Sequence, residues 1–406
     1  MTFDVYAVQR DFPVLSQTVH GHPLVYLDNG ASAQKPQIVI DTMARFMSDA
    51  YANVHRGVHT LSQKATEAFE GVRPIVQRFI NAAHEDEIVF TRNTTESINL
   101  VAQSWGRANL KKGDEVLITA LEHHANIVPW QMLRDALGIV LRVVPVTPEG
   151  DVRIEDVRAA LSDKTKLVAV AHTSNVLGTV LPIKEIVQAA HDAGALALID
   201  GAQGVCHDAS DVQAWDADFF CFSGHKLYGP TGIGVLYGKR ALLAEMPPYQ
   251  GGGDMISSVS FEKTLYKDPP YRFEAGTPAI VEVLGLRAAI EYLSALGMQN
   301  IAAHEHALLT YATQKLAAIE GVRIVGQAKH KAAILSFVMD QAHPHDIGTI
   351  LDRCGVAIRA GHHCAQPLMD HLGIVATARA SFGLYNTIED VDALVAAVTK
   401  VQEIFG

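Results

Sequence analysis

Residues 219–234 read FFCFSGHKLYGPTGIG, and this stretch places a lysine between an apolar run and a run of glycines. The five residues FFCFS are typical of a strand in a sheet that is covered on both faces. GPTGIG is typical of a turn. Lysine is usually a solvated surface residue, and it is rarely buried without a partner. The flanking Ser223, Gly224 and His225 nevertheless favour a chemical role for Lys226.

Similar apolar runs precede this stretch and alternate with amphipathic segments such as IKEIVQAAHDAG at 183–194. The runs are EVLITA at 115–120, LRVVPV at 141–146, LVAVAH at 167–172 and LALID at 196–200. Such alternation predicts βα units, and therefore an α/β fold with a mostly parallel sheet between helices.

The pattern changes after about residue 285. A long helical stretch is followed by the strand-like runs VRIVG and AILSFVM and by a closing helix at 391–406, which predicts a smaller α+β domain. We therefore expect a large domain at 26–285, a small domain at 286–406 that carries Cys364, and an N-terminal segment at 1–25 that packs with the small domain.

Composition excludes several classes of function. The net charge of -11 and the absence of clustered Lys and Arg argue against a nucleic-acid surface. No run reaches the ~18 apolar residues of a membrane span, and the N-terminus has no signal-peptide core, which predicts a cytoplasmic protein. The four cysteines form no CxxC pair, so we expect neither a disulfide framework nor a metal site.

Polar side chains gather where the predicted strands end. In open α/β sheets, ligands bind beyond the carboxyl ends of the strands, so these residues are expected to share one site. They are Glu122, His123 and His124 after the first run, Ser174 and Asn175 after the third, Asp200, Gly201 and Gln203 after the fourth, and Gly224, His225 and Lys226 after FFCFS.

Lys226 and Asp200 together indicate a pyridoxal-5′-phosphate (PLP) site. A lysine in a desolvated turn has a lowered pKa, and only the neutral amine condenses with an aldehyde. A carboxylate beside the pyridine nitrogen keeps that ring protonated and makes it a better electron sink. The alternative for Asp200 is an aspartate that ends a strand and caps a turn.

The segment TRNTTESINLVAQSW at 91–105 predicts a helix that Thr94 or Thr95 caps. Helix N-termini bind phosphate through free backbone amides and the helix dipole, although an ordinary N-cap explains the same residues. His123 either stacks on a flat cofactor ring or lies on the rim of the site.

Cys364 lies in RAGHHCAQPLM, beside His362 and His363 and between Arg359 and Arg379 in the sequence. A cationic setting favours the thiolate, which is the nucleophilic form of cysteine. A zinc ligand or a buried thiol remains the alternative. Cys206, Cys221 and Cys354 lie in or beside apolar runs and are expected to be packing residues.

The chain resembles the class II (SufS-type) cysteine desulfurases, which are fold-type I PLP enzymes of the aminotransferase class V family. The resemblance extends over essentially the whole chain. The motifs that carry it include YLDNGASAQKP at 26–36, FTRNTTESIN at 90–99, FSGHKLYGPTGIG at 222–234 and RAGHHCAQPLM at 359–369.

The resemblance implies how PLP is held. Lys226 bonds covalently to the cofactor, Asp200 pairs with the pyridine nitrogen, Gln203 contacts the ring hydroxyl, and His123 stacks on the ring and helps to move protons. The phosphate is bound by Thr95 with Thr94 nearby, by Ser223 and His225, and by Thr277 from the second subunit of a homodimer.

The resemblance also implies the substrate, L-cysteine, and its reaction. Arg379 binds the substrate carboxylate with help from Asn175, His55 and Arg359 line the substrate side, and Cys364 receives the sulfur as a persulfide. A sulfur acceptor like SufE or SufU, and iron–sulfur cluster assembly as the destination, follow from the resemblance alone.

Other activities remain open at this point. A selenocysteine lyase or cysteine sulfinate desulfinase would need Lys226 but depend much less on Cys364. A PLP aminotransferase has no use for a thiol in a cationic loop. A Rossmann-type oxidoreductase is disfavoured because no GxGxxG opens an early βα unit. A non-enzymatic scaffold would not need Lys, Asp and Cys at strand ends.

Overall fold

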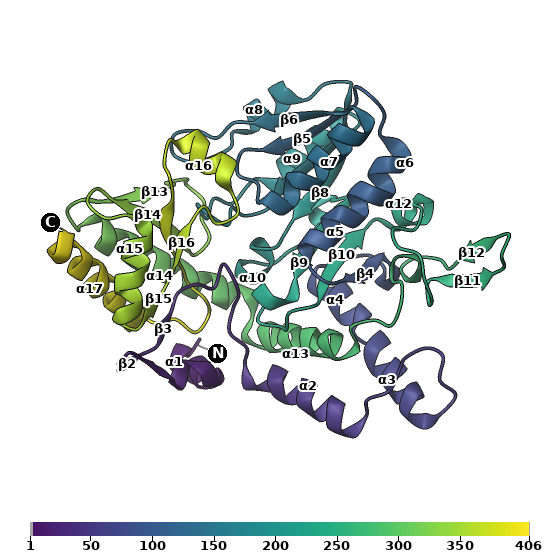
Figure 1. The fold of residues 1–406 in the computed structure, drawn as a ribbon, viewed down its shortest axis with the longest axis horizontal. Coiled ribbons are helices and arrows are strands. Elements are labelled where there is room, and N and C mark those ends of the chain that lie inside the picture. Colours follow the sequence, from purple (N-terminus) through teal and green to yellow (C-terminus); the bar gives the residue numbers. More distant parts are fainter. Residues whose placement is uncertain (1–2, 406) are drawn as a thin grey trace.

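The computed structural model describes residues 3–405 and is built around a seven-stranded sheet (Figure 1). The strands lie in the order β4 (Ile88–Thr91), β10 (Gly234–Gly238), β9 (Phe219–Ser223), β8 (Leu196–Asp200), β7 (Thr165–Ala171), β5 (Glu115–Thr119) and β6 (Val140–Val144). Strands β9, β8, β7, β5 and β6 run parallel, whereas β10 is antiparallel to both of its neighbours. This confirms the predicted α/β fold.

Both faces of this sheet are buried. Leu167 and Ala169 of β7 pack with α5 (Thr94–Val101) and α7 (Val128–Leu137), and Val168 and Val170 pack on the other face with α9 (Ile183–Asp192). Successive side chains of a strand point to opposite faces, so a strand covered on both sides must be apolar throughout. This explains the continuous apolar runs in the sequence.

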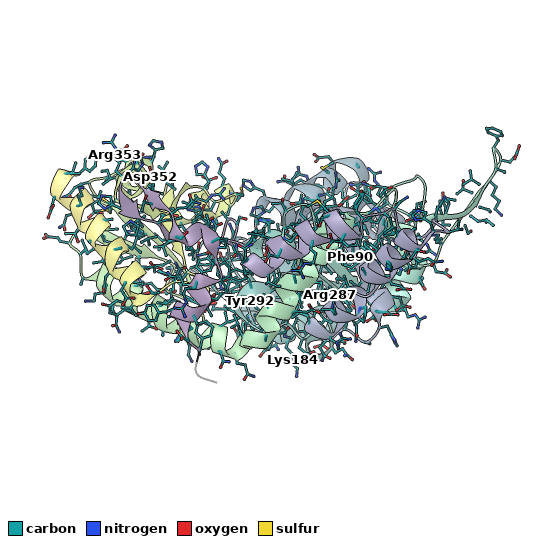
Figure 2. The ribbon with its side chains drawn as sticks, turned by 90° about the horizontal axis from the view of Figure 1, so that it is seen from below. Phe90, Lys184, Arg287, Tyr292, Asp352 and Arg353 are labelled. Carbon is teal, nitrogen blue, oxygen red and sulfur yellow. The ribbon has the colours of Figure 1, made fainter. Side chains whose placement is uncertain are left out.

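Two long helices pack side by side below the sheet. They are α2 (Gln37–Asp49) and α13 (Ile280–Leu296), and α3 (Thr60–Glu70) and α4 (Arg73–Phe79) lie against α13. Figure 2 views these helices from below and labels Arg287 and Tyr292 on α13. The Tyr292 hydroxyl donates to Asp11 Oδ2 at 2.8 Å, which joins α13 to the N-terminal segment.

The C-terminal part contains a four-stranded antiparallel sheet. Its strands lie in the order β13 (Val322–Val325), β14 (Ile334–Met339), β17 (Thr377–Ser381) and β16 (Arg359–Gly361). Leu335 and Phe337 of β14 pack with α14 (Met298–Ala317), α15 (Pro344–Arg353) and α17 (Ile388–Phe405) in a separate apolar core.

The N-terminal segment contacts this C-terminal part. Strand β3 (Val25–Tyr26) pairs with β15 (Val356–Ala357), and the Tyr6 hydroxyl of α1 (Val5–Arg10) donates to Glu389 Oε1 at 3.0 Å. The predicted domain boundary between residues 285 and 286 lies inside helix α13. The division at that point stays a prediction.

Shorter elements connect these layers. They are β1 (Thr18–Val19), β2 (His22–Pro23), α6 (Arg107–Asn109), α8 (Ile154–Ala160), α10 (Gly204–His207), α11 (Val212–Trp215), α12 (Arg240–Glu245), β11 (Ile256–Val259), β12 (Thr264–Tyr266) and α16 (Gln366–Leu372). Strands β11 and β12 form a hairpin that projects from the body of the molecule (Figure 1). Within residues 3–405, no helix is long and apolar enough to cross a membrane.

We predict that Gly234→Ala destabilises the protein by about 1–3 kcal/mol, the usual cost of overpacking a tight site. A Cβ on Gly234 would lie 2.6 Å from Cα of Asn93, the residue that precedes α5. Because the obstacle is backbone, β10 and the start of α5 must move apart. Denaturant unfolding measures the loss.

Gly252→Ala is the matched control, since the nearest atom to its added Cβ is 3.9 Å away. An unfolding midpoint for Gly234→Ala that equals that of the control would contradict the close packing of β10 on α5.

Candidate active site

A cavity of about 220 Å³ lies beyond the carboxyl ends of β7, β8 and β9. It also reaches the start of α5 and the loop that carries Cys364. The sequence-predicted residues that line it are Thr94, Thr95, His123, Asn175, Asp200, Gln203, Ser223, His225, Lys226, Arg359, Cys364 and Arg379. The remaining two, His55 and Thr277, lie elsewhere.

Lys226 ends a short 3-10 turn, Gly224–Lys226, that directly follows β9. Burial lowers the pKa of Lys226, and the positive charges of Arg379 and Arg359 lower it further, whereas the carboxylate of Asp200 acts in the opposite direction. A lowered pKa raises the share of neutral amine, the form that attacks a carbonyl carbon.

Asp200 forms the tip of β8 and is only 5% exposed. Its Oδ1 accepts from the Ala202 backbone at 2.9 Å, and burial raises its pKa. Gln203 follows on the same turn, where its Nε2 donates to the Gly30 carbonyl at 2.6 Å. Gln203 Oε1 is buried without a hydrogen-bond partner among the described residues, so it is suited to a donor from a bound group.

The start of α5 offers polar groups to the cavity. Asn93 is the N-cap of this helix, because its side chain accepts from the Glu96 backbone at 2.9 Å. The predicted cap at Thr94 or Thr95 is therefore wrong: both are the first residues of the helix itself. Thr94 Oγ1 lies 2.8 Å from Ser223 Oγ, which ties the helix to the Lys226 turn.

These groups fit PLP. One cavity holds a lysine with a lowered pKa, a buried carboxylate, an unsatisfied amide oxygen, and hydroxyls at a helix N-terminus. The lysine suits the aldehyde of that cofactor, and the carboxylate suits its pyridine nitrogen. The amide oxygen suits the ring hydroxyl, and the helix N-terminus suits the phosphate.

His123 is held as a neutral imidazole with a defined tautomer. Burial and the charge of Lys226 lower the pKa of His123 to about 3. The Ala125 backbone donates to His123 Nδ1 at 3.0 Å, so Nδ1 is the acceptor and Nε2 carries the hydrogen. This side chain therefore has an N–H available for donation.

Arg379 is a cation buried between two parts of the chain. Arg379 is only 1% exposed. Its Nη1 donates to the Asn175 carbonyl at 2.7 Å, and its Nη2 donates to Asp28 Oδ1 at 3.0 Å. Its Nε is buried without a partner among residues 3–405. Arg359 faces Arg379 across strands β16 and β17, so two guanidinium groups border one cavity. Such a site suits a carboxylate.

Cys364 is half-buried in a loop with an unusual backbone. His363 and Cys364 have φ angles of 54° and 57°, in the left-handed region. The loop is fixed by Asn175 Nδ2, which donates to the His363 carbonyl at 2.6 Å, and by the His124 backbone, which donates to the Cys364 carbonyl at 2.7 Å. Cys364 lines the same cavity as Lys226.

The other three cysteines lie outside this cavity. Cys206 and Cys221 are buried, Cys354 is partly buried, and all four thiols are free. Across the described part of the chain, no group of three or more His, Cys, Asp or Glu side chains could hold a metal ion.

His55 and Thr277 occupy other places in the chain. His55 Nε2 lies 2.6 Å from Glu70 Oε1 and its Nδ1 lies 3.2 Å from Asp254 Oδ2, so both ring nitrogens are engaged by carboxylates. Thr277 lines a separate hollow with Arg92, Glu96 and Tyr249. The structure therefore does not bring either residue to this cavity in one copy of the chain: the predicted phosphate contact of Thr277 involves a second subunit, and the predicted place of His55 on the substrate side stays a prediction.

Several residues of the site were not predicted from the sequence. Gly30, Ala31, Asn93 and His363 also line the cavity, and Asp28 holds Arg379. The polar run DNGAS at 28–32 follows the apolar VYL at 25–27. That pattern was available as a signal, because polar residues directly after a strand are site candidates.

We predict that Asp28→Asn lowers the free energy of unfolding by about 2 kcal/mol or more, because it leaves the Arg379 cation buried without its carboxylate partner. Asp268→Asn is the control, since Asp268 is fully exposed and lies 3.8 Å from its arginine. Denaturant unfolding of both variants measures the difference. Equal midpoints would contradict a structural role for the Asp28–Arg379 pair.

Comparison with known proteins gives a consistent result. The family described as aminotransferase class-V matches residues 25–394. A cysteine desulfurase of Salmonella typhimurium is 51% identical over the full length of both chains. A cysteine desulfurase of Synechococcus elongatus is 53% identical over 98% of this chain and 64% of its own, so this chain spans about two thirds of that relative.

Solved structures agree. The cysteine desulfurase CsdA of Escherichia coli superposes with a TM-score of 0.93 at 39% identity, covering all of both chains. With this likeness and the full-length match to the Salmonella enzyme, the chain belongs to the aminotransferase class-V family and, within it, to the PLP-dependent cysteine desulfurases of fold type I.

Proposed function

We propose that this protein is a cysteine desulfurase that converts L-cysteine to L-alanine and keeps the sulfur on Cys364 as a persulfide. The observation that carries the proposal is the presence of Lys226, Asp200 and Cys364 on one cavity. The lysine and aspartate suit PLP, whereas a thiol facing them serves a reaction in which sulfur leaves the substrate.

The cofactor would be held as follows. Lys226 would bond to its aldehyde carbon, Asp200 would pair with the ring nitrogen, and Gln203 Oε1, which has no partner among the described residues, would accept from the ring hydroxyl. His123 stacks on the ring. The phosphate is bound by Thr94, Thr95, Ser223 and His225, and by Thr277 from the second subunit of a homodimer. When bound, PLP supplies an electron sink for negative charge at the substrate Cα.

Lys226 would also act as the base at the substrate Cα. Burial lowers the pKa of Lys226, which raises the share of neutral amine that would take the proton from the substrate Cα. Arg379 binds the substrate carboxylate, and the unpartnered Arg379 Nε supports this assignment. Asn175 and Arg359 border the same space.

Cys364 accepts the sulfur. Its thiolate forms a bond to the substrate sulfur while the bond between that sulfur and the substrate Cβ breaks, and the electron pair of the broken bond stays with Cβ. Protonation of that carbon gives alanine, so cysteine and one thiol become alanine and one persulfide. The neutral His123, with its hydrogen on Nε2, is placed to take part in proton transfer.

Lys226→Ala is expected to abolish the visible absorbance of covalently held PLP. Alanine formation from cysteine should fall by about 10³-fold or more, since both the covalent link and the proton acceptor are lost. Lys226→Arg is the control for charge: it keeps a cation but cannot form the link, and should be equally inactive. Absorbance spectra and an alanine assay test both. A Lys226→Ala enzyme that keeps the band and its activity refutes the role of Lys226.

Cys364→Ala is expected to keep the absorbance band and its shift on addition of cysteine, but to lose alanine formation. The thiol acts after cofactor and substrate are bound, so only the later step is affected. Activity of this variant on selenocysteine and cysteine sulfinate identifies the alternative, a selenocysteine lyase or cysteine sulfinate desulfinase. Full activity of Cys364→Ala on cysteine is incompatible with persulfide formation on this residue.

The partners of the enzyme belong to the same proposal. We infer a homodimer from the family resemblance, which assigns Thr277 of a second subunit to the phosphate; Thr277 lines a hollow apart from the cavity of its own chain. A carrier similar to SufE or SufU would take the persulfide sulfur toward iron–sulfur cluster assembly, and the cytoplasm is the expected location.

A further inference from the structure

The loop that carries Cys364 needs external support. His363 and Cys364 both have positive φ angles, a conformation that residues with a Cβ rarely adopt and keep only when surrounding contacts hold it. The helix α16 begins two residues later, at Gln366. The backbone between the thiol and this helix is therefore short and must be fixed at both ends.

Helix α16 lacks a cap of its own. Its N-cap residue is Ala365, which has no polar side chain, and no side-chain hydrogen bond is made by that residue. The first N–H groups of a helix have no partner within the helix and need an acceptor from outside. His124 provides one: its Nε2 accepts from the Gln366 backbone at 3.1 Å.

The same histidine also holds the cysteine. The backbone N–H of His124 donates to the Cys364 carbonyl at 2.7 Å, so one residue contacts both ends of the segment 364–366. An imidazole that accepts at Nε2 must be neutral with its hydrogen on Nδ1. Burial and the neighbouring His362 lower the pKa of His124, which keeps the acceptor form at neutral pH.

His124 is itself held on a rigid support. It begins the turn His124–Asn126, which follows His123 of the cavity. Asn126 is fully buried, where its Nδ2 donates to Glu122 Oε2 at 2.7 Å and its Oδ1 accepts from Trp130 Nε1 at 2.9 Å. The turn thus sets the cysteine loop at a fixed place relative to His123.

We propose that His124 is a positioning residue that caps helix α16 from outside and thereby holds Cys364 where it meets the substrate sulfur. We call the two contacts of His124, with the Gln366 amide and the Cys364 carbonyl, the His124 clamp. Its effect on catalysis rests on the proposed function, whereas the clamp itself is a property of the protein alone. It adds to the reaction a residue that touches neither cofactor nor reacting atoms.

Three substitutions separate the acceptor from the shape of the ring. His124→Phe keeps the ring but removes the acceptor, and His124→Gln places a carboxamide oxygen near the position of Nε2. His124→Asn has an acceptor that is too short to reach Gln366. The backbone bond to Cys364 is available in all three. His371→Phe is the control, because His371 Nε2 contacts the Val146 carbonyl at 3.1 Å from the far end of the same helix.

The first readout is amide hydrogen exchange of peptides that cover residues 362–368, measured on the PLP-loaded enzyme without substrate. The Phe and Asn variants should exchange about fivefold faster, which is the population change expected for one net hydrogen bond. The Gln variant and His371→Phe should exchange like the parent protein.

The second readout is turnover of cysteine. In the Phe and Asn variants kcat should fall about tenfold or more, because small misplacement of a reacting group is costly, while KM and the spectral shift on cysteine binding stay unchanged. The Gln variant should recover most of the kcat. Comparison of Gln with Asn keeps the test valid if His124→Phe does not fold.

The proposal is overturned if the Phe and Asn variants have the amide exchange rates and the kcat of the parent protein. It is also overturned if kcat falls as much in His124→Gln as in His124→Asn, or if His371→Phe shows the same faster exchange and lower kcat. Faster exchange in the Phe and Asn variants of a protein that forms no alanine from cysteine would instead leave the clamp standing and remove the proposed function.

Discussion

The buried guanidinium of Arg379 is the constraint on which the arrangement of the site depends. It lies on β17 of the C-terminal sheet, yet it contacts the Asn175 carbonyl beyond β7 and the carboxylate of Asp28 after β3. A cation this deeply buried is stable only with partners that fix it. One side chain therefore joins the N-terminal segment, the large sheet and the C-terminal sheet at the point where the cavity lies.

The positive charge of this residue also contributes to the lowered pKa values of its neighbours. Arg379 adds to burial in lowering the pKa of Lys226, and in lowering the pKa of His363 to about 3. The cavity therefore holds two cationic guanidinium groups beside an amine that loses its proton readily. Such a site attracts a carboxylate and shifts the amine toward its neutral form, so both effects follow from the same charges.

Much of this site could be predicted from the sequence because its residues follow apolar runs. Lys226 and Asp200 come directly after two such strands, and parallel strands bring their carboxyl ends to one edge. The Asn93 cap was missed because Asn93, Thr94 and Thr95 are all good N-caps and only the helix geometry separates them. The role of Asp28 depends on Arg379, 351 residues away, and no local pattern reports such a contact.

The Cys364 loop shows what the local sequence does not report. A cationic motif favours the thiolate form of a cysteine, but it does not tell how that cysteine is held in place. The left-handed backbone at His363 and Cys364 turns the chain sharply before α16. Asn175 holds it by donating to the His363 carbonyl. His124 holds it by donating to the Cys364 carbonyl and by accepting from the first amide of the helix. The Asn175 carbonyl also accepts from Arg379, so Arg379 and the Cys364 loop are joined through one residue. The residues beside Cys364 in the sequence thus predict its cationic surroundings. Its position, in contrast, depends on Asn175 and His124, which follow strands far away in the chain.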